Sequence, residues 1–72
     1  MNDAQRKKID AAKTFIDNAI NILNDVKDTE EEAQANMNNE EQKEKSEEAV
    51  SSLDSAIEQL EEAQDNLDSA RA

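Results

Sequence analysis

The chain has 72 residues and a formal net charge of −11, with nineteen acidic residues against eight basic ones. It contains no cysteine, histidine, glycine or proline. The usual general base at neutral pH, a thiolate nucleophile and the imidazole or sulfur ligands of metals are therefore absent, and no glycine-rich phosphate-binding loop can form. We expect no enzymatic activity, no cofactor and no metal site.

The same composition predicts one all-α domain over residues 1–72, because helix-forming residues dominate and β-branched and aromatic residues are scarce. No stretch approaches the ~20 consecutive apolar residues of a membrane span, and the N-terminus lacks the apolar region of a secretory signal. We expect a cytoplasmic protein. The negative charge disfavours direct binding to nucleic acid or to anionic membrane and favours a protein partner, in particular a basic one.

The first predicted helix covers residues 3–37. Asn2, followed by Asp3 and Gln5, forms a capping-box pattern at its start. Apolar and small residues then recur at alternating spacings of three and four, which is the a/d seam of a heptad repeat. The predicted seam consists of Ile9, Ala12, Ile16, Ala19, Leu23, Val26, Glu30, Ala33 and Met37.

The predicted turn covers residues 37–40, where Met37, Asn38 and Asn39 are the best turn candidates, because asparagine tolerates the left-handed conformation that ends a helix when glycine is absent. An alternative break lies at Thr29, which forms a second capping-box pattern with Glu32. The segment from residue 27 to residue 48 holds nine acidic and three basic residues but a single large apolar residue, Met37. We therefore expect this distal part to be flexible.

The second predicted helix covers residues 40–71 and begins at Asn39, which with Gln42 forms another capping-box pattern. Its predicted seam again alternates small and large residues, namely Ala49, Leu53, Ala56, Leu60, Ala63, Leu67 and Ala70. The two helices should fold back into an antiparallel, coiled-coil-like hairpin. Registers in which paired residue numbers add to about 79 or to about 72 both match large residues with small ones, so the register stays open.

A second apolar stripe flanks the predicted seam and consists of Phe15, Ile20, Ile22, Val50 and Ile57. A lone hairpin would leave this stripe exposed, and an apolar face wider than the a/d seam is typical of a helix in a larger bundle. We therefore expect two hairpins to form a homodimeric four-helix bundle through these residues. The alternative is a monomer that uses the stripe to hold a different protein.

Acidic residues line the predicted outer face of the second helix. They are Glu47, Asp54, Glu58, Glu61, Glu62, Asp65 and Asp68. At ~1.5 Å of rise per residue most of these carboxylates stand ~5–6 Å from the next, and duplex DNA has charges at a comparable order of spacing. The face could imitate nucleic acid, as small phage-encoded inhibitors do, or could serve solubility alone.

The sequence thus favours a non-enzymatic protein-binding or assembly module built as a small acidic hairpin. The alternative is a phage-type inhibitor that mimics nucleic acid and blocks a basic DNA- or RNA-binding protein. Eight asparagines, several of them inside the predicted helices, argue against an idealised designed bundle and favour a natural gene of an AT-rich bacterium or its phage.

Overall fold

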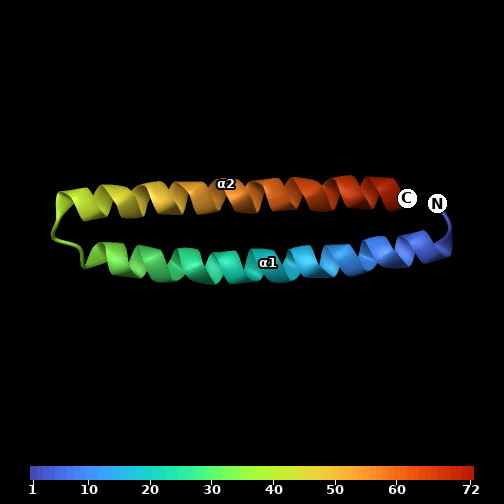
Figure 1. Cartoon of the computed structure of the whole chain (residues 1–72), viewed down its shortest axis with the longest axis horizontal. Coiled ribbons are helices and arrows are strands. Elements are labelled where there is room, and N and C mark those ends of the chain that lie inside the picture. The colour runs from blue at the N-terminus through green and yellow to red at the C-terminus, as the bar shows by residue number, and fades with distance from the viewer.

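The computed structural model describes residues 1–72 as two antiparallel helices, α1 (Asp3–Ala35) and α2 (Glu40–Arg71). The two helices run side by side along their whole lengths, with both chain termini at one end and the connecting turn at the other (Figure 1). The hairpin is slender, with Cα extents of 56 × 15 × 10 Å. Both helices are long because no glycine or proline interrupts either segment. Neither helix combines the length and the apolar character that crossing a membrane requires.

Asparagine side chains cap the start of both helices, as predicted, but the reciprocal bond of the predicted capping box forms only at Asn2. Asn2 accepts a hydrogen bond from the backbone N–H of Gln5 at 2.8 Å, and the Gln5 side chain accepts one from the Asn2 backbone at 3.1 Å. Asn39 accepts from the backbone N–H groups of Glu41 and Gln42 at 2.9 and 3.2 Å. These bonds satisfy N–H groups that have no partner within the first turn of a helix.

The turn differs from its prediction at the end of α1. No residue has a positive φ angle, and Asn36 ends the helix at φ −101° and ψ 3°. The prediction of an asparagine in the left-handed conformation was therefore wrong. The N–H groups of Asn36 and Met37 donate to the carbonyls of Ala33 and Gln34, each at 3.1 Å, so the last carbonyls are satisfied without a left-handed residue.

The alternative break at Thr29 is also wrong, because α1 continues through this residue without interruption. The contacts between the helices extend beyond it, since Gln34 and Ser46 are hydrogen-bonded across the hairpin. Tertiary packing on both sides of Thr29 therefore keeps the chain helical.

Between the helices lies a seam of residues that are half-buried or buried, spaced alternately by four and three. On α1 it consists of Ile9, Lys13, Ile16, Ile20, Leu23, Lys27, Glu30 and Gln34, and Met37 of the turn continues it. On α2 it consists of Lys43, Ser46, Val50, Leu53, Ile57, Leu60, Gln64, Leu67 and Arg71. The predicted seam is correct at every seventh residue and lies one residue too early at the alternate positions. At three positions the shift replaces alanine by Ile20, Val50 or Ile57, which bury more apolar surface. At the other five it places polar residues in the seam, namely Lys13, Lys27, Gln34, Gln64 and Arg71.

Polar pairs across the hairpin fix its register. Asp10 with Arg71, Lys13 with Asp68, Asp17 with Gln64, Lys27 with Asp54 and Gln34 with Glu47 are all ion-paired or hydrogen-bonded, and the residue numbers of each pair add to 81. The hydrogen-bonded seam residues Gln34 and Ser46 add to 80. The observed register is close to the predicted one of 79 and excludes the one of 72.

The apolar core is small and lies in the middle of the seam. Ile57, with 7% of its surface exposed, is the one buried apolar residue. The register places Ile20 opposite Leu60 and Leu23 opposite Ile57, and the layers on either side combine an apolar residue with Lys27, Glu30 or Gln64. Most of the hairpin is therefore held together by half-buried layers of mixed character.

Candidate interaction faces

The seam divides the rest of the surface into two faces of different chemistry. Successive residues of a helix turn by about 100°. The residue that precedes Ile20 in the chain therefore faces one side of the seam, and the residue that follows Ile20 faces the other, and the same holds at every seventh residue. Because the helices are antiparallel, the preceding positions of α1 and of α2 lie on the same side of the hairpin. A shallow groove on the other side is lined by Asp17 and Asn21 of α1 together with Glu61 and Asp65 of α2, as this geometry requires.

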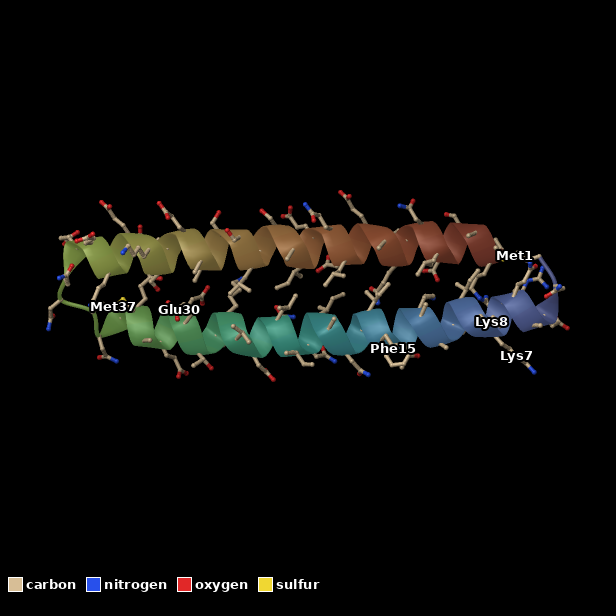
Figure 2. All side chains as sticks on the ribbon, viewed as in Figure 1. Met1, Lys7, Lys8, Phe15, Glu30 and Met37 are labelled. Atoms are coloured by element: carbon tan, nitrogen blue, oxygen red, sulfur yellow. The ribbon has the colours of Figure 1, made fainter.

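The first face, here called the uncharged face, is the central stretch of fourteen positions within residues 12–33 and 49–70; beyond it the same helical positions hold the exposed residues Lys8 and Lys45. They are Ala12, Phe15, Ala19, Ile22, Val26, Thr29 and Ala33 of α1 and Ala49, Ser52, Ala56, Gln59, Ala63, Asn66 and Ala70 of α2. None is charged, although 38% of the chain is. Three large apolar side chains stand out from it, with Phe15 exposed by 74%, Ile22 by 62% and Val26 by 47%. Figure 2 shows Phe15 pointing away from α2.

The structure separates the five residues that the sequence assigned to the flanking stripe. Phe15 and Ile22 lie on the uncharged face and are exposed, as expected. Ile20, Val50 and Ile57 instead lie in the seam, where Ile57 is buried and the other two are half-buried. The physical reason is the one-residue shift of the seam, which brings large apolar residues between the helices. Val26, assigned to the seam, lies on the uncharged face.

The second face, here called the acidic face, draws carboxylates from both helices. Glu47, Asp54, Glu61 and Asp68 follow the seam of α2 at intervals of seven residues, with Glu58 and Asp65 farther out, whereas Glu62 lies on the outer edge of α2. From α1, Asp10, Asp17 and Glu31 follow the seam in the same way. Sequence reasoning missed this second row, because which α1 residues share the acidic face depends on which α1 residues form the seam. The predicted α1 seam lay one residue too early at alternate positions.

Basic side chains neutralise part of the acidic face. The Lys27 Nζ lies 2.6 Å from Asp54 Oδ1, and the Arg71 Nε lies 2.7 Å from Asp10 Oδ1. Lys13 is similarly paired with Asp68. The two lysines occupy seam positions, so their aliphatic stems cover the seam while their ammonium groups reach the acidic face. Five carboxylates of the face are in no ion pair and form its unneutralised part, namely Asp17, Glu47, Glu58, Glu61 and Asp65.

Lys27 lies against a carboxylate that changes its pKa. The hydrogen bond to Asp54 and the charge of that carboxylate raise the pKa of Lys27 above its ordinary value of 10.5, with smaller help from Glu31 and Asp28. Partial desolvation acts in the opposite direction. The pair therefore favours the charged lysine at neutral pH.

A pH dependence of stability follows from this shift. Because the folded-state pKa of Lys27 is raised, its contribution is fully present below pH 10.5 and is lost as the pH rises through the folded-state pKa. We expect the thermal midpoint, followed by circular dichroism, to fall more steeply above pH 10.5 in the native chain than in Lys27→Gln. Lys8→Gln removes a lysine that has no ion pair and serves as the control. Equal slopes in all three proteins would contradict this assignment.

The side chains form no cluster of three or more His, Cys, Asp or Glu residues that is placed to hold a metal ion. The exposed side chains of Phe15, Ile22 and Val26 offer apolar contact on one face, and the unpaired carboxylates attract positive charge on the other. Comparison of the chain with models of protein families, with curated proteins and with solved structures finds no match.

Proposed function

We propose that this chain is a non-enzymatic assembly and protein-binding module of the cytoplasm, and that it self-associates through its uncharged face into a homodimeric four-helix bundle. The observation that carries the proposal is the exposure of Phe15, Ile22 and Val26 on a face that has no charged residue. Large exposed apolar side chains grouped on one face are typical of interaction sites. Their burial against a second hairpin would supply the core that one hairpin lacks.

The exposed side chains allow self-association to be tested separately from folding. Phe15→Glu and Ile22→Glu place a charge at positions that contribute little to the seam, since they are exposed by 74% and 62%. We expect each to convert the dimer to a monomer in sedimentation equilibrium while the hairpin stays helical by circular dichroism. Asn18→Glu adds the same charge at an exposed position of α1 outside the uncharged face and should stay dimeric. A dimer that survives both face variants would contradict the proposal.

A second candidate function, that of an inhibitor that mimics nucleic acid, is favoured by the acidic face. Asp17 of α1 and Glu61 and Asp65 of α2 line one groove, so carboxylates of two helices face the same side. Two roughly parallel rows of negative charge could occupy the basic groove of a DNA- or RNA-binding protein. The ion pairs of Asp54 and Asp68 work against this candidate, because they reduce the charge that the face presents.

Charge reversal distinguishes the two candidates. A tagged chain would be used to capture proteins from bacterial extract, with elution in rising salt and identification by mass spectrometry. The inhibitor candidate requires one basic nucleic-acid-binding protein that elutes steeply with salt and is lost when Glu58, Glu61 and Asp65 are all replaced by lysine. Capture that survives this triple replacement, or that is indifferent to salt, would exclude the inhibitor candidate.

A further inference from the structure

The uncharged face has a symmetry of its own. On α1, Phe15 and Val26 are equally far from the midpoint between residues 20 and 21, and so are Ala19 and Ile22. On α2, the four alanines at positions 49, 56, 63 and 70 are symmetric about the midpoint between residues 59 and 60. The hairpin register pairs residues whose numbers add to about 80, so the two midpoints lie side by side. A two-fold axis through them, perpendicular to the helices, maps the α1 residues of the face from 12 to 29 onto one another and the four alanines of α2 onto one another. It brings Ala33 against Lys8 and brings Ser52, Gln59 and Asn66 against seam leucines.

We infer that the partner of the uncharged face is a second copy of this chain, docked about this axis with the two turns at opposite ends of the bundle. The inference rests on the self-association proposed above and adds its geometry. In this arrangement α1 packs antiparallel against α1 of the partner subunit, and α2 against α2. A dimer with two-fold symmetry requires a self-complementary face, which the positions of these residues provide.

The side chains fit this arrangement in size. Phe15 of one copy meets the partner's Val26, and Ile22 meets the partner's Ala19, so the large apolar residues lie together on the α1 side. On the α2 side Ala56 meets the partner's Ala63, and small residues allow the two helices to approach closely. The absence of charge matters equally, because each copy carries a net charge of −11 and buried like charges would oppose association.

The distribution of charge favours turns at opposite ends over turns at the same end. Residues 1–13 hold four basic and two acidic residues, whereas residues 27–48 hold nine acidic and three basic ones. Opposite turns place the basic N-terminal segment of each copy beside the acidic distal segment of the other. Turns at the same end would bring the two acidic segments together, where like charges repel.

The size of the face is sufficient for a stable dimer. With the average exposure of a residue in this chain, its fourteen positions would present about 1,000 Å² of the accessible surface of 5320 Å². Stable protein interfaces typically bury about 800 Å² on each partner. The full overlap of two hairpins, each 56 Å long, makes this area available.

Single cysteines introduced into this cysteine-free chain test the geometry. Gln59 lies next to the inferred axis, so Gln59→Cys should form an intersubunit disulfide on mild oxidation. Glu62→Cys, on the outer edge of α2, is the control and should not. Spin labels attached to Asn38→Cys in the turn should lie nearly as far apart as the 56 Å length of the hairpin, measured by double electron–electron resonance.

Different outcomes separate this inference from the proposed function. A dimer that has a short distance between its labelled turns and no Gln59→Cys disulfide would overturn the inferred geometry while self-association stands. A native chain that stays monomeric at high concentration would overturn both. A disulfide at Gln59→Cys together with distant turns is the result that the inference predicts.

Discussion

Ile57→Ala is expected to unfold most of the hairpin. Ile57 is the one buried apolar residue and lies in the central layer of the seam, opposite Leu23. Truncation of a buried isoleucine to alanine typically costs ~2–5 kcal/mol in the free energy of unfolding. One core in a chain of this size seldom supplies more than ~3–5 kcal/mol, so the loss is comparable with the total. Thermal and urea unfolding followed by circular dichroism measure it.

Ile22→Ala is the matched control, because it removes the same atoms from a side chain that is exposed by 62%. Both variants should be compared in the Phe15→Glu background, in which the proposed self-association is removed. There we expect Ile22→Ala to change the free energy of unfolding by less than about 0.5 kcal/mol. Similar losses in the two variants would mean that Ile57 does not occupy the seam and that the described packing is wrong.

Glu30→Leu should stabilise the hairpin. Glu30 is a half-buried seam residue that takes part in no ion pair and lies opposite Val50 in the observed register, between the two helices in Figure 2. Leucine at this position would create an apolar layer in the distal part of the seam. We expect a gain of about 1–2 kcal/mol from apolar burial, which corresponds to a rise in the thermal midpoint of about 4–16 °C in a small domain.

Glu32→Leu separates burial from charge in this experiment. Glu32 is exposed on the same helix, so its replacement removes one negative charge from the acidic distal segment without adding a seam layer. We expect a much smaller change in the thermal midpoint than for Glu30→Leu. If both variants gain equally, relief of charge repulsion rather than packing limits the stability of the distal segment.

Much of the fold could be predicted from the sequence, because local signals of several kinds agree. Helix propensity, the absence of glycine and proline, and the caps at Asn2 and Asn39 together define two helices joined by a short turn. The backbone conformation of the turn could not be predicted in the same way, since it depends on where the two helices meet. The hydrogen bonds of Asn36 and Met37 at the end of α1 made a left-handed residue unnecessary.

The phase of the seam could not be derived from spacing alone. Residues 9, 16, 23, 53, 60 and 67 belong to two overlapping heptad patterns, one completed by alanines and Val26 and the other by Ile20, Val50, Ile57 and polar residues. Which of the two patterns forms the seam depends on how much surface each buries when the helices meet, and on ion pairs between the helices such as that of Lys27 with Asp54. The composition of both faces follows from the pattern that forms the seam, which is why the uncharged face emerged only with the structure.

The mass of the native chain in solution tests the central claim most directly. In sedimentation equilibrium at rising protein concentration, self-association through the uncharged face predicts a species of twice the 8.0 kDa of one chain. The same species should be absent from Phe15→Glu. A mass of one chain at every concentration would contradict the proposed assembly and would mean that Phe15, Ile22 and Val26 remain exposed in the protein by itself.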